Sequence, residues 1–168
     1  IAIPPGVTHI KQGVFYNCTG LSNVIIHAGV TIIDNNAFDR CSSLPAVAIP
    51  DSVVCIGVGA FADCRNLREI AVDASNPKYE SRGGALYDKS QAALVQFPAG
   101  IEGNIAISSG TMRVAERACE GCSQLTGIWI PPGVVDIGNR AFSSCSALTN
   151  IVLPNTVTNV GREAFYAC

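Results

Sequence analysis

Cysteine is the residue type with the greatest capacity for chemistry in this 168-residue chain, which contains eight cysteines. Thiols can form disulfides, bind metals or act as nucleophiles. Six of the eight recur at intervals of 23, 23, 58, 23 and 23 residues: Cys18, Cys41, Cys64, Cys122, Cys145 and Cys168. Because they recur in phase with apolar residues, we predict buried free thiols that fill a core. Disulfides between adjacent repeats stay open as the alternative, since stacked strands lie on the order of 5 Å apart.

Two smaller signals for metal binding or catalysis have structural explanations. Cys119 and Cys122 form a C-x-x-C sequence, but they occupy positions that the repeat fills with Phe and Cys, and no second pair completes four zinc ligands. The two histidines, His9 and His27, stand at different repeat phases and have no local nucleophile signature. We therefore predict a protein that is not an enzyme, with no cofactor and no catalytic, cofactor-binding or metal-binding residues.

The elements that position these cysteines follow from the repeat, which reads approximately I-x-I-P-x-x-V-x-x-I-x-x-x-A-F-x-x-C-x-x-L-x-x. Alternation in segments such as Ile128-Trp129-Ile130 predicts a strand whose middle residue points outward, and the proline that follows ends the strand. The V-x-x-I pair predicts a short second strand, and A-F-x-x-C predicts a single helical turn with one buried face. One unit cannot bury its apolar side alone, so stacked copies are expected to form a solenoid.

This unit closely resembles the BspA-type leucine-rich repeats, and the resemblance covers essentially the whole chain. It implies an α/β solenoid rich in β-structure, wound as a right-handed leucine-rich repeat superhelix. A parallel sheet would line one face of that superhelix, and short strands and single helical turns would line the other. The resemblance also implies a cell-surface or secreted protein, because several members of the family are regarded as adhesins.

The regular period breaks once, between Cys64 and Cys122. The interval of 58 residues equals 23 plus 35, so one repeat is about twelve residues longer than the others. Apolar pairs on either side of a polar turn at residues 88–91 predict a hairpin in this insertion. We predict one leucine-rich repeat domain in preference to two solenoid domains joined by a linker. Its predicted parts are regular repeats at 1–69, an irregular repeat with the hairpin at 70–104, and regular repeats at 105–168.

Composition and charge exclude two classes of partner. The chain has 11 basic and 13 acidic residues, a formal net charge of -2, and no run of basic residues. A protein that binds the phosphate backbone of a nucleic acid needs a basic surface, so we expect no nucleic-acid binding. The apolar stretches are short and broken by Pro or Gly, so we expect no membrane insertion.

The outward strand positions are the predicted binding surface, because outward residues of a repeat can vary without disturbing the core. One column is apolar throughout and includes the only tryptophan: Ala2, Ile25, Ala48, Ala71, Ala106, Trp129 and Val152. The adjacent column is mostly small or polar: Asn23, Ala46, Glu69, Asn104, Gly127 and Asn150. Two interpretations stay open: a sheet face with incidental apolar residues, and a shallow recognition surface anchored on Trp129 and Ile25, which supplies the candidate binding residues. Secondary candidates lie on the insertion: Tyr79, Arg82, Tyr87 and Lys89.

The predicted function is a non-enzymatic adhesion or protein-binding module of the cell surface, with an extracellular-matrix or host surface protein as partner. The alternative is a structural spacer or scaffold segment of a surface protein, with no ligand of its own. Neither end of the chain has a polar capping repeat. We therefore expect a fragment of a larger protein, and open end repeats that can stack end to end on another copy.

Overall fold

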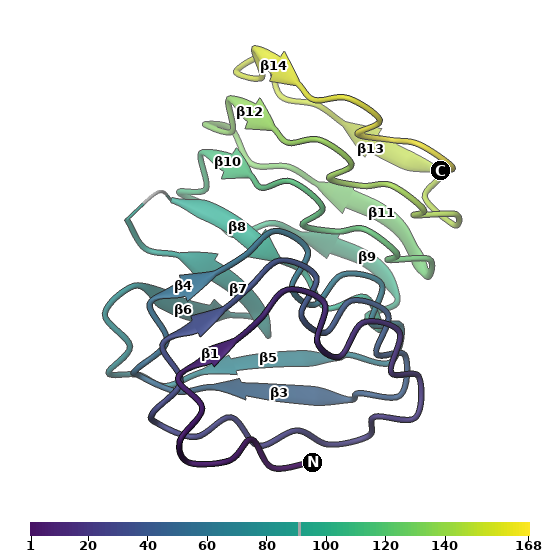
Figure 1. Cartoon of the computed structure of the whole chain (residues 1–168). Helices are drawn as coiled ribbons and strands as arrows, with labels where there is room; N and C mark the ends of the chain where they lie inside the picture. The colour runs from purple at the N-terminus through teal and green to yellow at the C-terminus, as the bar shows by residue number, and fades with distance from the viewer. Residues whose placement is uncertain (91) are drawn as a thin grey trace.

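A computed structural model describes residues 1–90 and 92–168 of the chain (Figure 1). These residues form a β-solenoid of about seven turns, called coils here. Coils 1 to 7 span residues 1–23, 24–46, 47–69, 70–104, 105–127, 128–150 and 151–168. Within the described part of the chain there is no helix of the length and apolarity that crossing a membrane requires.

The longer strands lie on one side of the solenoid in two separate parallel sheets. The first sheet pairs β3 with β5, and the second has the order β13-β11-β9. The bounds are β3 (Ala46–Ile49), β5 (Glu69–Val72), β9 (Gly103–Ala106), β11 (Leu125–Trp129) and β13 (Asn150–Val152). Equivalent residues of successive coils are in register, so that Trp129 lies between Ala106 and Val152. The predicted parallel sheet is confirmed, but it is interrupted between β5 and β9.

A second row consists of two-residue strands formed by the last two residues of the V-x-x-I segments. Their order is β1-β2-β4 in the first three coils and β10-β12-β14 in the last three. The bounds are β1 (His9–Ile10), β2 (Ile32–Ile33), β4 (Cys55–Ile56), β10 (Arg113–Val114), β12 (Asp136–Ile137) and β14 (Asn159–Val160). The prediction of short second strands is confirmed.

Coil 4 differs from the others because it contains antiparallel strands. These strands are β6 (Tyr79–Arg82), β7 (Ala85–Asp88) and β8 (Ala93–Gln96), and β8 then pairs in parallel with β10. The predicted hairpin is therefore confirmed, although Gln91 of its turn lies outside the described residues. The Ile70 N–H donates to the carbonyl of Gly84 at 2.8 Å, so the β6–β7 turn covers the edge of β5 where the next parallel strand would otherwise pair.

The A-F-x-x-C segments are chains of turns rather than the predicted helical turns, and that part of the expected α/β class is wrong. The described residues form no helix. In coil 1 the Cys18 N–H donates to the carbonyl of Phe15 three residues back, whereas the Phe15 N–H donates to Ala37 in the next coil. Alternate N–H groups therefore bond to a neighbouring coil, and they are not available for the continuous i to i−4 series of a helix.

Backbone dihedral angles give the second reason that these segments are not helical. Two residues in each such segment, four positions apart, have a positive φ: Gly13 and Asn17, Asn36 and Arg40, Gly59 and Asp63, Arg117 and Gly121, Arg140 and Ser144, and Glu163 and Ala167. A positive φ is incompatible with a right-handed helix, and it is unfavourable for residues other than glycine. The hydrogen bonds between coils compensate for that strain.

The Phe and Cys positions of the repeat build the core. Phe15, Phe38 and Phe61 form a stack with ring centroids 5.1 and 5.3 Å apart. Five cysteines are buried: Cys41, Cys64, Cys119, Cys122 and Cys145. The prediction that all six repeat cysteines are buried is wrong for Cys18 and Cys168, which are exposed. These two lie in coils 1 and 7, where a neighbouring coil covers them on only one side.

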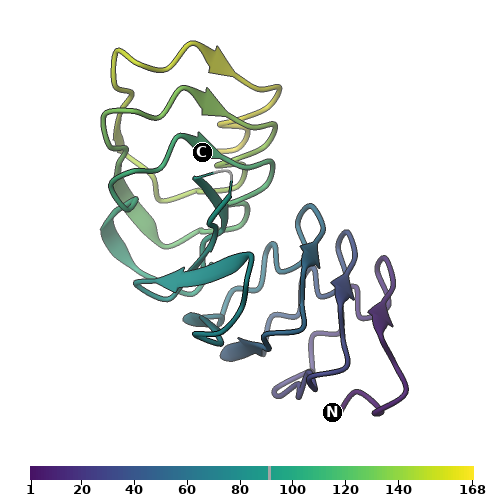
Figure 2. The ribbon, with the colours of Figure 1, turned by 90° about the vertical axis from the view of Figure 1, so that its left-hand side faces the viewer.

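The solenoid bends at coil 4, so that coils 1–3 form an N-terminal arm and coils 5–7 a C-terminal arm (Figure 2). On the turn side, coil 3 lies directly against coil 5, and the Asp63 N–H donates to the carbonyl of Glu120 at 3.1 Å. On the other side, the strands of coil 4 are inserted between the arms. The core divides at β7, where Leu86 packs in the N-terminal cluster and Ala85 and Tyr87 pack in the C-terminal cluster. Because coil 4 is inserted on one side of the solenoid and not on the other, the stack of coils bends there.

Candidate binding surfaces

The C-terminal arm contains a groove lined by two of the predicted binding residues, Trp129 and Val152. Trp129 and Val152 are 52% and 70% exposed, and Ala106 beside them is also exposed. We call the depression beside them, about 240 Å³ in volume, the tryptophan groove; it is lined by Asn104, Ile105, Gly127, Ile128, Trp129, Asn150 and Val152. The alternation that places Ile128 and Ile130 in the core directs Trp129 outward, as predicted.

The N-terminal arm contains the second groove, about 350 Å³ in volume, called the alanine groove here. It is lined by Asn23, Val24, Ile25, Ile26, Ala46, Val47, Ala48 and Ala71. Ile25 is its large exposed side chain, whereas Ala48 is exposed and Ala71 half-buried. The structure does not bring Ile25 and Trp129 into one surface, because coil 4 interrupts the row of strands between β5 and β9.

The two tyrosines predicted as secondary binding residues anchor the insertion instead. Both are 3% exposed. The hydroxyl of Tyr79 accepts a hydrogen bond from the Ile56 N–H at 2.9 Å, and burial raises its pKa to about 12. The hydroxyl of Tyr87 accepts one from the Ser108 N–H at 3.1 Å. Each tyrosine therefore joins coil 4 to a flanking coil, and neither side chain is available to a partner.

The two cationic candidates on the insertion remain at the surface, in local contacts. The Arg82 guanidinium lies 5.2 Å from the ring centroid of Tyr87 and pairs with Glu80 at 2.5 Å. The ammonium group of Lys89 donates to the backbone carbonyl of Asn76 at 2.7 Å. These contacts hold both cations close to the surface of coil 4.

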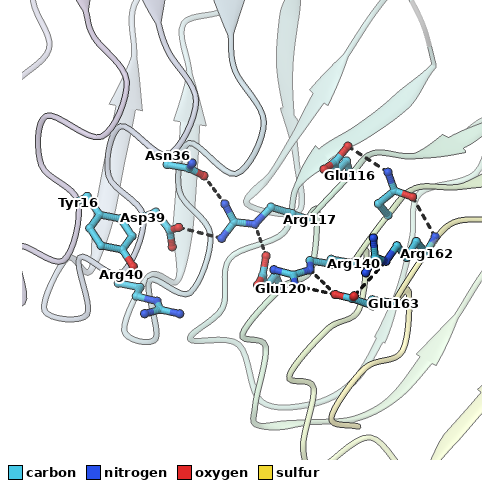
Figure 3. A pocket seen from close by; sticks show the side chains of 11 residues that line it. Tyr16, Asn36, Asp39, Arg40, Glu116, Arg117, Glu120, Arg140, Arg162 and Glu163 are labelled. Atoms are coloured by element: carbon cyan, nitrogen blue, oxygen red, sulfur yellow. Dashed lines mark hydrogen bonds and ion pairs between the residues drawn. The ribbon is translucent and has the colours of Figure 1, made fainter.

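A polar cleft of about 550 Å³ between the arms was not expected from the sequence (Figure 3). It is lined by Tyr16, Asn36, Asp39, Arg40, Glu116, Arg117, Glu120, Asn139, Arg140, Arg162 and Glu163. Its four arginines are balanced by four carboxylates, and Arg140 and Arg162 both pair with Glu163, at 2.6 and 3.1 Å. No sequence motif could reveal this cleft, because its walls come from coils that are far apart in the chain.

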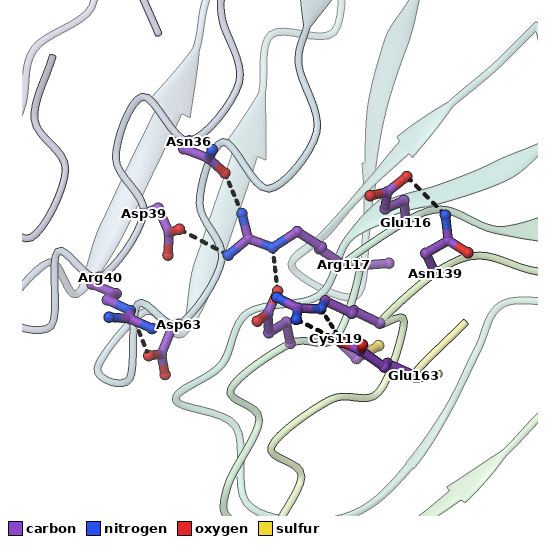
Figure 4. Close-up of polar contacts among 12 residues, drawn as sticks. Asn36, Asp39, Arg40, Asp63, Glu116, Arg117, Cys119, Asn139 and Glu163 are labelled. Carbon is purple, nitrogen blue, oxygen red and sulfur yellow. Dashed lines mark hydrogen bonds and ion pairs between the residues drawn. The ribbon is translucent and has the colours of Figure 1, made fainter. Parts of the chain in front are cut away.

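Arg117 connects the two walls of this inter-arm cleft (Figure 4). Its guanidinium pairs with Glu120 in its own coil and reaches Asn36 and Asp39 in coil 2, with 2.8 Å to the Asp39 carboxylate. It crosses coil 3 at Gly59, where an added Cβ would lie 2.5 Å from Nη1 of Arg117. Glycine adopts the positive φ of this position without strain and leaves the space through which the guanidinium passes.

The charges in this bridge are buried and strongly coupled. The side chains of Asp39, Glu120 and Arg117 are 4%, 12% and 14% exposed. Burial raises the pKa of Asp39 above 3.8, against the opposing effect of Arg117. Burial alone would lower the pKa of Arg117, but its bonds to Glu120 and Asp39 raise it. One oxygen of Asp39, Oδ1, has no hydrogen-bond partner among the described residues.

The histidines take part in contacts between coils. The Nε2 atom of His9 lies 3.1 Å from the Asp34 carboxylate. His27 Nε2 lies 2.7 Å from the Pro4 carbonyl, and its Nδ1 accepts the Gly29 N–H. These contacts pair neither ring with a serine or cysteine side chain. Within residues 1–90 and 92–168, no three or more His, Cys, Asp or Glu side chains form a group suited to a metal ion.

We expect the cysteines to differ sharply in reactivity. All eight are free thiols, and Cys18, Cys55 and Cys168 are exposed. Burial raises the pKa of Cys41 to about 11, and because the thiolate is the reactive form, the buried thiols should be inert. Alkylation of the native protein at neutral pH, followed by peptide mass spectrometry, should modify the three exposed cysteines and spare the five buried ones. Without reductant, the denatured protein should react at all eight, and fewer would contradict free thiols.

Comparison with known proteins gives a family match over the chain. The model of the BspA type leucine rich repeat region matches residues 1–103 and 99–168, with six copies. No curated protein is similar enough to count as a match.

Solved structures of bacterial proteins have the same fold. A leucine rich cell surface protein from Faecalibacterium prausnitzii is 32% identical, with a TM-score of 0.90 over 99% of this chain and 44% of that one. The pneumococcal vaccine antigen PcpA is 25% identical, with a TM-score of 0.92 over 99% of this chain and 42% of that one. A leucine-rich repeat protein from Eubacterium ventriosum, 23% identical with a TM-score of 0.66 over 95% of this chain and 55% of that one, shares the fold. The chain therefore spans less than half the length of the first two proteins.

Proposed function

The chain belongs to the BspA-type leucine-rich repeat family, and from that membership we propose that it is a non-enzymatic module that binds another protein through the tryptophan groove. Family membership itself indicates a protein-interaction or structural module. The exposure of Trp129 supports binding, because this only tryptophan of the chain stands half in solvent at the wall of the groove. A rigid aromatic side chain held outward by two buried neighbours is typical of an interface anchor.

We propose the cell surface or the secreted fraction as its location, and adhesion to an extracellular-matrix or host surface protein as its activity. The location is supported by the similar proteins, one of which is named a cell surface protein and another a vaccine antigen. Trp129, Ala106 and Val152 then form the main contact, with the alanine groove as a second contact in the other arm.

We propose further that residues 1–168 act as a single domain. The support is that the arms are joined by contacts other than the chain of coil 4. Coil 3 hydrogen-bonds directly to coil 5 through Asp63 and Glu120, and Arg117 reaches from coil 5 to Asp39 of coil 2.

Replacing Trp129 with alanine should weaken binding without unfolding the protein. Loss of a central aromatic anchor costs at least about 2 kcal/mol of binding free energy, which is about a 30-fold increase in Kd. Because Trp129 is half exposed, the free energy of unfolding should change by less than about 1 kcal/mol. Immobilised extracellular-matrix and host surface proteins, tested first against the unaltered chain, provide the binding measurement.

The matched control is Ile25→Ala, which removes an exposed apolar side chain at the equivalent position of the other arm. Its effect on binding should be smaller than that of Trp129→Ala. Saturable binding that is unaffected by Trp129→Ala would refute the role of the tryptophan groove. An absence of saturable binding to every protein tested would favour a structural spacer.

A further inference from the structure

The tryptophan groove has one apolar wall and one wall of amides. Trp129 and Val152 form the apolar wall. Asn104 lies two residues before Ala106 on β9 and Asn150 two residues before Val152 on β13, so both are on the same face of the sheet. Gly127 is in register with both asparagines and separates them. Because Gly127 has no side chain, the Asn104 amide lies over it, in the place that a Cβ would take, on the same face as the indole.

The two amides have unused hydrogen-bonding capacity. Oδ1 of Asn104 accepts a hydrogen bond from the Thr126 hydroxyl at 3.2 Å, and the described residues offer its Nδ2 no acceptor. The side chain of Asn150 makes no hydrogen bond to any described residue. Each primary amide has two donors and one carbonyl acceptor, so both asparagines can donate to and accept from a ligand.

The groove carries no charge. All seven of its lining residues are uncharged, in contrast to the inter-arm cleft with its four arginines and four carboxylates. A charged ligand would lose hydration here without gaining an opposite charge. The complementary ligand is therefore uncharged, with hydroxyl groups for the amides and an apolar face for the indole.

We propose that the tryptophan groove binds an uncharged glycan, with one sugar ring on the Trp129 indole and its hydroxyls hydrogen-bonded to Asn104 and Asn150. This inference rests on the proposed function and specifies the part of the partner that the groove contacts, a glycan carried by a surface glycoprotein. Sugar rings combine an apolar C–H face with hydroxyls that both donate and accept, which matches an apolar site with a few placed polar groups.

An extended peptide fits this groove less well. β11 is paired on one side with β9 and on the other with β13, so it has no free edge to which a peptide strand could be added. A peptide lying on the face of the sheet would have to be held by side-chain contacts alone. The amide wall leaves only Trp129 and Val152 as large apolar anchors for it.

The single tryptophan provides a direct test of binding at this place. Titration of the 168-residue chain with uncharged gluco-, galacto- and manno-oligosaccharides should change the fluorescence of Trp129 and reach saturation for at least one of them. The same scaffold bearing sialic acid or sulfate at the bound sugar should bind at least about tenfold more weakly, since no cation lines the groove. No saturable change with any uncharged oligosaccharide would overturn the proposal, as would preferential binding of the acidic forms.

Variants of the amide wall test the assignment of residues. Asn150→Ala should raise Kd for the oligosaccharide about tenfold through loss of its hydrogen bonds, and Gly127→Ala should do the same because its Cβ would collide with the Asn104 amide. Asn155→Ala, which removes an exposed amide of the same arm that lines neither groove, is the matched control and should leave Kd unchanged. Equal affinity of Asn150→Ala and the unaltered chain would overturn the assignment.

Enzymatic deglycosylation separates this inference from the proposed function. Binding to a glycoprotein that requires Trp129 and disappears after removal of its glycans supports both. Binding that requires Trp129 but persists on the deglycosylated protein supports protein binding and refutes the glycan. Binding of the glycoprotein that does not depend on Trp129 refutes both uses of the groove.

Discussion

Replacing Arg117 with alanine is expected to destabilise the chain by about 3–5 kcal/mol at pH 7, the effect of breaking a buried ion pair by removal of one partner. Asp39 and Glu120 would be left as two buried carboxylates without their common cation. Oδ1 of Asp39 already has no hydrogen-bond partner among the described residues, so the variant would leave this carboxylate with still fewer polar contacts. Equilibrium unfolding in denaturant measures the difference in free energy.

The loss of stability caused by Arg117→Ala should depend on pH in a defined direction. Burial raises the pKa of Asp39 above 3.8 in the folded state, so ionisation of Asp39 lowers stability as the pH rises through that pKa. Arg117 opposes this shift, and removing it should raise the folded pKa further. The difference in free energy of unfolding between the unaltered chain and Arg117→Ala should therefore be largest at pH 7. It should decrease as the pH falls toward about 4, where Asp39 becomes protonated in both proteins.

Arg140→Ala is the matched control for Arg117→Ala. Both arginines occupy the same position of the repeat and have a positive φ, of 60° for Arg117 and 53° for Arg140, so the backbone effect of alanine is shared. The Arg140 side chain is half exposed and pairs with Glu163 at the surface, where solvent screens the ion pair, so its loss should cost much less stability than that of Arg117. Equal losses in the two variants, or a loss at Arg117 that does not vary with pH, would contradict the buried bridge.

Phe38→Ala is the second substitution with a large expected effect, a destabilisation of about 3–5 kcal/mol. The ring is fully buried and stacks on Phe15 on one side and Phe61 on the other, with centroids 5.1 and 5.3 Å away. The coils on both sides are held by backbone hydrogen bonds, so they cannot close the cavity that alanine would leave. Denaturant unfolding at constant pH provides the measurement.

Two substitutions in coil 1 calibrate this prediction. Phe15→Ala removes the same side chain from a position that is only partly buried and should cost less than Phe38→Ala. Tyr16→Ala removes a ring that is 49% exposed and should cost less than about 1 kcal/mol. If Tyr16→Ala and Phe38→Ala had equal costs, the assignment of inward and outward columns would be refuted.

The bend of the solenoid has a consequence for binding. It places the tryptophan groove and the alanine groove on different arms, and the Arg117 bridge holds these arms together. A partner that contacts both grooves would have to match that angle. A partner confined to the tryptophan groove, such as a glycan with one sugar ring on Trp129, would not depend on that angle.

Much of the fold could be predicted from the sequence because its information is local and repeated. The alternation in Ile128-Trp129-Ile130 is sufficient to place the two isoleucines in the core and the tryptophan outside. The interval of 23 residues predicts coils in register, as the pairing of Trp129 with Ala106 and Val152 shows. The longer interval located the irregular coil and its hairpin. The sequence also shows that Asn104, Gly127 and Asn150 share an outward column, but the ligand that this column can bind depends on the Trp129 indole next to it.

The tertiary structure alone decided the features that depend on contacts between coils. The apolar spacing of A-F-x-x-C suits a helical turn and a chain of turns equally, and hydrogen bonds such as Phe15 to Ala37 select the turns. Tyr79 and Tyr87 resemble surface residues of an insertion, yet their hydroxyls satisfy backbone N–H groups of coils 3 and 5. Arg117 meets Asp39 across 78 positions of the chain. A repeat pattern records which residues face inward in each coil, but the insertion in coil 4 bends the stack, and only the bent stack determines which outward residues meet.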